Sequence, residues 1–345
     1  MAAATAAAPS AQDIQLFNIQ QKYAQEAAKR FRSDGINQYV VIGNVEEGRL
    51  RELAQDPWAD HAALNAREPA IKDGAQHKFL VLGAGYGGLL FAARVKQAGL
   101  VNGPDDLRLV DNAGGFGGTW YWNRYPGLHC DVESYTYMPL LEETGYAPTQ
   151  KYASGPELRE HADRIATHFD LHDKTLFRSQ VKTARWDEET QLWNVHIVEG
   201  RGPEEPSRDL HIKVQYVLAA SGVLTTPQVP KIPGLESFSG SMFHTARWDY
   251  SISGGKPDDW ALTGLEGKRV GILGTGATAI QVVPQVAKWA KELYVFQRTP
   301  SAVSERGQRR TDPEEWYVFI PFTVVCRKKC SPKNRKKIAY KKGCK

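Results

Sequence analysis

Cysteines and long apolar runs are both scarce in this chain. Its four cysteines, Cys130, Cys326, Cys330 and Cys344, form no C-x-x-C pair, so the sequence indicates neither a disulfide framework nor a zinc site. No apolar run approaches the roughly 18 residues of a membrane span, and the first residues lack the basic start and apolar stretch of a secretory signal. We therefore expect a cytoplasmic protein with a free thiol at Cys130, no metal site and no membrane span.

Acidic side chains are absent from residues 327–345, although this stretch holds 10 of the 44 Lys and Arg. The remainder carries 34 basic and 39 acidic side chains, so the net charge of +5 reflects the last residues alone. A basic run can bind nucleic acid or anionic membranes electrostatically, but an isolated run is more often solvated. We expect no nucleic-acid partner.

The length of 345 residues favours two domains of ordinary size. Apolar side chains at mostly helical spacing predict an amphipathic helix over residues 12–34. From Lys78 a short apolar run, a glycine-rich turn and a helical segment follow one another, as they do where a buried parallel strand enters a helix. A second apolar stretch, Leu107 to Val110, ends at Asp111.

The second half of the chain contains this strand, turn and helix pattern again. Residues 182–200 and 211–222 show the alternation or the apolar runs of strands. The prolines of residues 223–234 exclude regular structure over several positions. Residues 268–290 then predict a strand, a glycine turn and a helix, and residues 292–298 predict a further strand.

The first glycine motif, from Gly83 to Gly88, fits G-x-G-x-x-G, and Asp111 follows 23 residues later. In dinucleotide-binding folds the first glycine permits a tight turn, the second lets a pyrophosphate approach the backbone, and the third lets helix and strand pack closely. An acid at the end of the next strand accepts hydrogen bonds from a ribose. Because strand, helix and acid are all in place, we favour a dinucleotide site over a glycine turn kept for packing alone.

The second glycine motif, from Gly274 to Ala279, has alanine in place of the third glycine, as the fingerprint allows. Gln297 and Arg298 stand after the next strand, where an acid would suit NAD. An arginine there can bind a 2′-phosphate, which favours NADPH over NADH; the alternative is a solvated surface arginine. Two nucleotide folds in one chain are typical of a flavin-reducing enzyme.

The segment between these motifs is the most specific part of the sequence. Phe238, Gly240, His244, Trp248 and Asp249 fit the pattern F-x-G-x-x-x-H-x-x-x-W-[PD] completely, and this pattern resembles the fingerprint of Baeyer–Villiger monooxygenases. In that family the segment links the two nucleotide domains and couples their movement. His244 is then either a satisfied interdomain histidine or a catalytic group, and we favour the first interpretation.

An aromatic-rich loop, from Gly117 through Gly127 to Ser134, resembles the same family. The glycine motif and the resemblance together imply FAD contacts at Gly83, Gly85, Gly88, Asp111, Thr119, Trp120, Tyr121, Trp122, Asp131, Val132 and Tyr137. They imply NADP contacts at His129, Cys130, Asp131, Gly274, Thr275, Gly276, Ala277, Thr278, Ala279, Ile280, Gln297 and Arg298. Asp131 also matches the aspartate that pairs with the family's catalytic arginine; alternatively, it accepts backbone hydrogen bonds within its own loop.

The resemblance runs from about Phe79 to Trp316 and is strongest to the fungal secondary-metabolism enzymes of the family. It implies an α/β protein with two Rossmann-like, doubly wound parallel-sheet nucleotide-binding domains, of which the FAD domain is incomplete. We divide the chain into an N-terminal helical extension (1–76), a partial FAD-binding domain (77–222), a partial NADP-binding domain (223–316) and a basic, non-homologous tail (317–345).

The resemblance also implies a reaction. In the family, NADPH reduces FAD, the reduced flavin reacts with dioxygen, and an oxygen atom is inserted next to a ketone carbonyl to give an ester or lactone. The expected cofactors are therefore FAD and NADPH, and the expected partners are a small-molecule ketone and dioxygen. The adduct of the reduced flavin with dioxygen is a peroxide anion. In the family, bound NADP⁺ and an active-site arginine supply the positive charge that stabilises this anion.

The sequence departs from the family after residue 300. The catalytic arginine, the helical substrate region and the closing strands of the FAD domain follow this point in other members, whereas only 45 residues remain here. The arginines among them lie outside the catalytic motif, so we assign that role to no residue. The codons of residues 316–318 must contain GTAYGT, which resembles a splice donor, and we interpret residues 317–345 as a translated intron or an equivalent frame change.

Two alternatives stay open at this point, and a third is disfavoured. One is a truncated, catalytically inactive remnant that binds FAD or NADP. Another is a flavin monooxygenase that oxidises nitrogen or sulfur, although the Trp248-Asp249 ending and the aromatic loop favour the ketone-oxidising branch. A pyridine nucleotide–disulfide reductase is disfavoured, because no paired redox cysteines follow the first glycine motif.

Overall fold

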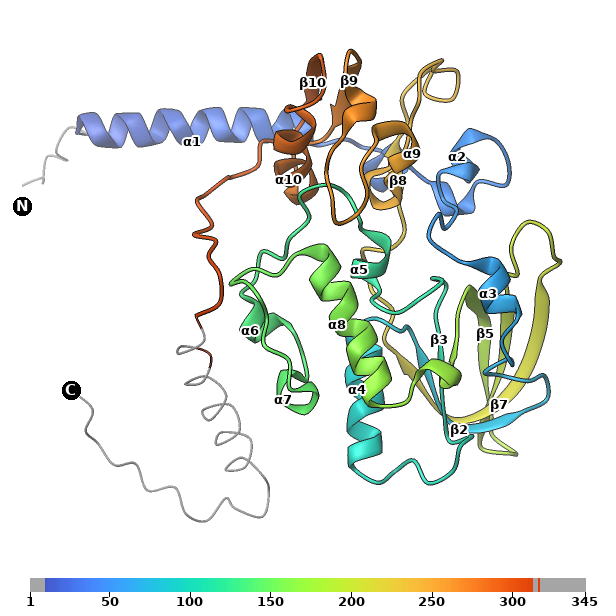
Figure 1. Cartoon of the computed structure of the whole chain (residues 1–345). Helices are drawn as coiled ribbons and strands as arrows, with labels where there is room; N and C mark the ends of the chain where they lie inside the picture. Colours follow the sequence, from blue (N-terminus) through green and yellow to red (C-terminus); the bar gives the residue numbers. More distant parts are fainter. Residues whose placement is uncertain (1–9, 313–315, 317–345) are drawn as a thin grey trace, which may run out of the picture.

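The computed structural model describes residues 10–312 and Trp316, so the tail and the frame change expected at 317–345 lie outside the described part of the chain. A six-stranded sheet with the order β4-β3-β2-β7-β6-β5 forms the main body (Figure 1). Its strands are β2 (Gln76–Leu82), β3 (Leu107–Val110), β4 (Thr175–Leu176), β5 (Ser179–Asp187), β6 (Leu192–Glu199) and β7 (Arg208–Ala219). Two smaller sheets pair β1 (Tyr39–Val41) with β8 (Gln228–Pro230), and β9 (Arg269–Leu273) with β10 (Glu292–Phe296).

Within residues 10–312, three helices of ten residues or more lie around these sheets, besides the N-terminal helix. The α-helices are α1 (Ala11–Arg30), α2 (Arg49–Glu52), α3 (His61–Asn65), α4 (Tyr86–Gln97), α5 (Thr119–Trp122), α6 (Ser134–Tyr137), α7 (Leu141–Thr144), α8 (Gly155–His168), α9 (Tyr250–Ser253) and α10 (Ala277–Val286). Single 3₁₀ turns are η1 (Gly35–Gln38), η2 (Ile42–Asn44), η3 (His172–Lys174), η4 (Thr245–Arg247) and η5 (Thr263–Leu265).

The helix expected near the N-terminus is confirmed as α1. A capping box starts it: Ser10 Oγ accepts from the Asp13 amide, and the Asp13 carboxylate accepts from the Ser10 amide at 2.9 Å. Its apolar side chains, such as Phe17, stay exposed, and Figure 1 shows the helix standing away from the body. Across the described residues, no helix combines the length and apolar character that a membrane crossing needs.

The main sheet combines a parallel part with an antiparallel part, and apolar clusters cover both faces of β2. Strands β4, β3, β2 and β7 run parallel, while β5, β6 and the first half of β7 form an antiparallel ribbon, which confirms the strands expected in residues 182–200 and 211–222. Side chains alternate along β2: Phe79 and Val81 pack with α4 and α8, whereas Leu80 packs with the antiparallel ribbon. Strands β2, β3 and β4 are therefore mostly buried on both faces, as their apolar runs predict, whereas β7 leaves Tyr216 exposed.

The crossing of α4 over the end of β2 is the tightest contact of this body. A Cβ added at Gly88 would lie 1.9 Å from the Gly83 carbonyl oxygen and 3.2 Å from Val81 Cγ1. No side chain fits there, which is the packing reason for the third glycine of the motif. A Cβ added at neighbouring Gly87 would have Ala220 Cβ as its nearest neighbour, at 3.9 Å, so Gly87 has room for a side chain.

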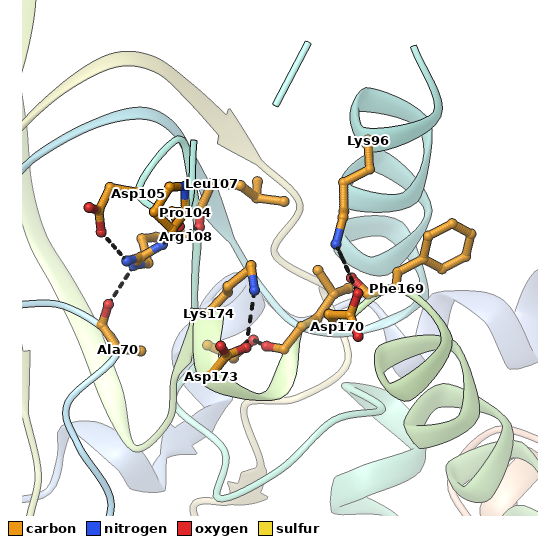
Figure 2. A network of polar contacts seen from close by, with 12 residues as sticks. Ala70, Lys96, Pro104, Asp105, Leu107, Arg108, Phe169, Asp170, Asp173 and Lys174 are labelled. Atoms are coloured by element: carbon orange, nitrogen blue, oxygen red, sulfur yellow. Dashed lines mark hydrogen bonds and ion pairs between the residues drawn. The ribbon is translucent and has the colours of Figure 1, made fainter. Parts of the chain in front are cut away.

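Polar contacts tie the ends of these elements together at the side away from the glycine turn (Figure 2). Arg108, only 8% exposed on β3, donates to the Ala70 carbonyl at 2.5 Å and pairs with Asp105 at 2.5 Å. Lys96, near the end of α4, donates to the Phe169 carbonyl at 2.5 Å, just beyond α8. These bonds satisfy one carbonyl just past the end of α8 and one in the loop between α3 and β2, where no helix or strand supplies a partner.

The second strand, turn and helix unit is smaller. Strands β9 and β10 pair in parallel, and α10 connects them. Buried Val282 and Val286 of α10 share an apolar cluster with Trp120, Leu128 and other residues of the first unit. The two units therefore share one apolar cluster.

The proline-rich stretch at 223–234 differs slightly from the expectation. Three of its residues form β8, which pairs antiparallel with β1 of the N-terminal extension, with Tyr39 opposite Pro230. Proline is tolerated because this ladder has only two strands and therefore only edges. The extension is thus attached to the body through a strand as well as through helices.

We predict that Gly88→Ala destabilises the protein by about 1–3 kcal/mol, the cost of forcing an extra methyl group into a packed contact. Gly87→Ala is the matched control and should be neutral or stabilising by up to about 1 kcal/mol, because Ala favours the helix. Urea unfolding of both variants measures the difference. Equal unfolding free energies would show that the Gly88 contact is not a constraint.

Candidate functional site

A cavity of about 450 Å³ lies at the carboxyl ends of β2 and β3, where α/β sheets bind nucleotides. Its walls come from residues 82–83, 85–87, 110–112, 117–120, 179–181, 220–222 and 225–226, with Tyr137 added from α6. Six of the predicted FAD contacts line it: Gly83, Gly85, Asp111, Thr119, Trp120 and Tyr137. Gly88 lies beneath the turn, in the contact with Gly83 described above.

Backbone rather than side chains forms the cavity wall at the glycine turn. Gly83 has a φ of +117°, and a Cβ on it would lie 2.7 Å from the Ala220 carbonyl oxygen. A Cβ on Gly85 would lie 3.3 Å from Gly118 Cα, so two glycine-containing loops approach each other directly. Gly85 also caps α4, whose first amides point out of the helix and suit an anionic group. This arrangement fits a pyrophosphate.

Asp111 joins the two sides of this wall. Its Oδ2 accepts from the Ala84 amide at 2.6 Å and its Oδ1 accepts from the Ala113 amide at 2.8 Å. Burial raises the pKa of this carboxyl, and the two backbone hydrogen bonds act against that increase. Each carboxylate oxygen keeps a further acceptor position, so Asp111 can hold the turn and still accept from a ribose hydroxyl.

The aromatic loop divides between the cavity and a second cluster. Trp120 lines the cavity and donates from Nε1 to the Tyr137 hydroxyl at 3.1 Å. Tyr121 and Trp122, also predicted to contact FAD, do not line it but pack with Ala113 and Trp58. The Tyr121 hydroxyl donates to Asp56 at 2.9 Å, and burial raises the pKa of that phenol. These two side chains support the loop from behind.

The loop around Asp131 lies outside the cavity wall. Cys130 is a buried free thiol, as expected, whereas Asp131 and Val132 are exposed. Burial raises the pKa of the Cys130 thiol, which keeps it protonated. Arg306 donates from Nη1 to the Cys130 carbonyl at 3.3 Å. The structure therefore brings an arginine to this loop that no sequence motif indicated.

The second glycine turn opens to solvent. Gly274 has a φ of +104°, Gly276 caps α10, and a Cβ on either would meet nothing within 4 Å. Thr275 donates from Oγ1 to the Thr299 carbonyl at 2.9 Å, which joins the turn to the segment after β10. The remaining predicted positions lie on or beside this unit: Ala277, Thr278, Ala279 and Ile280 on α10, and exposed Gln297 and Arg298 after β10.

The loop at residues 127–129 connects the two turns. The His129 amide donates to Gln281 Oε1 at 2.7 Å, and a Cβ on Gly127 would lie 2.6 Å from the Gln281 carbonyl oxygen. The predicted NADP contact His129 therefore touches the helix of the second turn directly. A second hydrogen bond joins α9 to the aromatic loop: the Tyr250 hydroxyl donates to the Arg124 carbonyl at 2.6 Å.

The fingerprint segment supplies caps and packing between the units. Trp248 is 4% exposed in the shared core and donates from Nε1 to Ser253 Oγ at 2.9 Å. Asp249 caps α9 by accepting from the Ser251 amide at 2.9 Å. Arg49 of the N-terminal extension donates to the carbonyls of Phe238 and Gly240. The fingerprint residues thus contribute one helix cap from Asp249, one buried side chain from Trp248, and two backbone carbonyls from Phe238 and Gly240.

His244 is a neutral cap. Its Nδ1 accepts from the Ala246 amide at 3.0 Å at the start of η4. Burial, with a smaller contribution from the nearby Arg247 charge, lowers the pKa of His244 to about 4. The imidazole is uncharged at neutral pH, which agrees with the interdomain interpretation and disfavours a role as a proton donor.

Sequence reasoning missed several residues that shape the site. Arg247, 7% exposed, lies with its guanidinium carbon 3.5 Å from the centre of the Trp122 ring, a cation–π contact that no motif marks. Residues 179–181 and 220–222 line the cavity because the start of β5 lies beside the end of β3, where the Ser179 amide donates to the Asp111 carbonyl, and because β7 pairs with β2. Only the topology brings them there, so local sequence offered no signal.

Two family models match the chain. One, described as flavin-binding monooxygenase-like, matches residues 134–342, and the other, an NAD(P)-binding Rossmann-like domain, matches residues 81–146. The first match continues past residue 316 and so includes most of the stretch that the sequence analysis separates as a tail.

Relatives of known name are fungal monooxygenases. The chain is 65% identical over 322 residues to a polycyclic ketone monooxygenase of Thermothelomyces thermophilus, covering 93% of this chain and 48% of that protein. It is 47% identical over 310 residues to a chermesin D/asnovolin J monooxidase of Aspergillus novofumigatus, covering 86% and 46%. The chain thus spans about half the length of these relatives.

Solved structures agree with this relationship. The polycyclic ketone monooxygenase superposes with a TM-score of 0.86 at 67% identity, covering 88% of this chain and 48% of that chain. OTEMO in complex with FAD and NADP superposes with a TM-score of 0.60 at 31% identity, covering 76% and 45%. The flavin-binding monooxygenase-like model matches residues 134–342, which is more than half of this chain, so the chain belongs to that family.

Proposed function

We propose that this chain is part of an NADPH- and oxygen-dependent flavin monooxygenase that inserts oxygen next to a ketone carbonyl. The observation that carries the proposal is the complete fingerprint from Phe238 to Asp249, with Trp248 buried between two nucleotide-type glycine turns. The 65% identity to a polycyclic ketone monooxygenase supports the ketone as substrate and favours a bulky polycyclic skeleton from secondary metabolism.

FAD is the group that the first cavity suits. Gly83 and Gly85 leave room for the pyrophosphate, Asp111 is placed for the ribose, and Thr119, Trp120 and Tyr137 complete the wall. Tyr121 and Trp122 act from behind by fixing the loop. When bound, the flavin supplies hydride acceptance from NADPH and the reaction with dioxygen.

NADPH is assigned to the second turn, with Gly274, Gly276 and the start of α10 at the pyrophosphate and Arg298 at the 2′-phosphate. His129 contacts α10, which supports its assignment to the NADPH site. We assign Asp131 the role of orienting an arginine near the reacting atoms. The division into an N-terminal extension, an FAD part and an NADP part is part of the same proposal.

The decisive experiment uses the purified chain reconstituted with FAD. Anaerobic addition of NADPH should bleach the flavin absorbance, and admission of oxygen with a polycyclic ketone should give an ester or lactone detectable by mass spectrometry. Flavin that binds and is reduced without product would favour the inactive remnant. Product formed from an amine or sulfide instead of a ketone would favour nitrogen or sulfur oxidation.

We expect Asp111→Asn to weaken FAD binding by roughly 10- to 100-fold, the scale of one lost hydrogen bond to a charged group. The amide nitrogen would face the Ala84 or Ala113 N–H and loosen the turn. Fluorescence titration with FAD measures the change. Asp106→Asn, at the opposite end of β3, is the control and should bind as the unaltered protein does.

The lowered pKa of His244 predicts a pH effect on stability. The folded value of about 4 lies below the ordinary 6.5, so the unfolded chain binds the extra proton between these values, and stability falls as the pH is lowered through this window. The loss reaches on the order of 3 kcal/mol. His244→Asn keeps a capping oxygen without this titration and should flatten the dependence of urea unfolding on pH. An unchanged slope would contradict this assignment.

A further inference from the structure

The side chain of Arg298 is held by the N-terminal extension. Its Nη1 donates to Gln38 Oε1, its Nη2 donates to the Tyr39 hydroxyl at 2.8 Å, and its guanidinium carbon lies 5.9 Å from the centre of the Tyr39 ring. Gln38 and Tyr39 are half-buried, whereas Arg298 is exposed. Two residues some 260 positions away in sequence therefore set the direction of a surface arginine.

Both partners are themselves fixed. Gln38 Nε2 donates to the Gly35 carbonyl at 2.5 Å, which orients its oxygen toward Arg298. The Lys231 amide donates to the Gln38 carbonyl at 2.9 Å, and Tyr39 is paired with Pro230 in the β1–β8 ladder. A free arginine side chain carries about 2 kcal/mol of rotamer entropy, and this support removes much of that freedom before a ligand arrives.

The backbone beside Arg298 is fixed from the other side. The Thr275 hydroxyl donates to the Thr299 carbonyl, and the Gly274 amide donates to the Phe296 carbonyl at 2.9 Å. Both donors belong to the glycine turn assigned to the pyrophosphate. The arginine and the turn are thus set at one end of the same two-stranded sheet.

The charge of Arg298 is left uncompensated. Its two side-chain partners are a neutral amide and a neutral phenol, and within the described residues it forms no ion pair with a carboxylate. A guanidinium has five N–H donors, so donors remain for an anion. The Tyr39 hydroxyl accepts from Arg298, which leaves its own proton to donate to a phosphate oxygen.

We propose that Gln38 and Tyr39 are specificity-determining residues for NADPH: they position Arg298, and the Tyr39 hydroxyl donates to the 2′-phosphate. This inference rests on the proposed function, which assigns the second glycine turn to a nicotinamide dinucleotide. A 2′-phosphate meets both the guanidinium and the phenol, whereas the 2′-hydroxyl of NADH leaves the charge of Arg298 unmatched. The extension therefore takes part in cofactor choice.

Three substitutions test the proposal. Tyr39→Phe removes only the hydroxyl, and Gln38→Glu replaces a neutral acceptor with a carboxylate that would pair with Arg298. Tyr294→Phe is the matched control, because Tyr294 is an exposed tyrosine on β10 whose hydroxyl bonds to Glu292 at 2.6 Å. Each is made in the full chain, and its melting temperature is compared with that of the unaltered chain.

The measurement is calorimetric binding of adenosine 2′,5′-bisphosphate and 5′-AMP, followed by NADP⁺ and NAD⁺. Tyr39→Phe should weaken the 2′-phosphorylated ligands about tenfold, the scale of one hydrogen bond to a charged group, and leave 5′-AMP and NAD⁺ unchanged. Gln38→Glu should weaken them roughly tenfold or more, because its carboxylate neutralises the guanidinium. Tyr294→Phe should change neither ratio.

The outcomes separate this inference from the function on which it rests. An unaltered chain that binds none of the four ligands overturns both. An unaltered chain that prefers the 2′-phosphorylated ligands, with Tyr39→Phe and Gln38→Glu keeping that preference, overturns the inference alone. Equal weakening of phosphorylated and unphosphorylated ligands also overturns it, because that pattern indicates a general structural effect.

Discussion

The close crossing of α4 over the end of β2 is the contact on which the rest of the site depends. Because Gly88 lies against the Gly83 carbonyl, the helix starts directly above the strand, and its amino end is aimed along the sheet edge. Asp111 then bonds the amides on either side of that edge. A residue with a side chain at Gly88 would push the helix outward and open the cavity to water, which would weaken every electrostatic contact inside it.

A shared apolar cluster holds the two nucleotide units together. Trp248, Val282 and Leu128 belong to one apolar cluster, so neither unit can shift far without exposing part of a common core. Hydrogen bonds at the border of this cluster, such as the one from the His129 amide to Gln281 Oε1, depend on direction as well as distance. If the two units move relative to each other, directional hydrogen bonds such as the one between His129 and Gln281 must break, whereas the apolar side chains of the shared cluster can shift against one another.

Sequence predicted the local parts of this arrangement well. Glycine spacing, apolar runs and the acid at the end of β3 located both turns, because each feature acts within about 30 residues. The linking role of the fingerprint came from its resemblance to a family, and the structure places Trp248 in the apolar cluster that both units share, whereas the non-catalytic interpretation of His244 stays a prediction.

What sequence could not predict depends on distant contacts. Tyr121 and Trp122 lie in the same short helix as Trp120, yet they pack against the extension because Asp56 and Trp58 arrive there from another part of the chain. The support of Arg298 by Gln38 and Tyr39 has the same origin. Sequence motifs cannot predict such pairs, because neither residue lies in a motif that indicates its distant partner.

The ladder between β1 and β8 has a consequence for the order of folding. Tyr39 pairs with Pro230, so during synthesis the ribosome must add almost 200 further residues before β1 meets its partner. Contacts of such large sequence separation form late, because the loop-closure entropy is lost before they stabilise the chain. Arg298 emerges later still, so Gln38 and Tyr39 can bind it only after β10 has left the ribosomal tunnel.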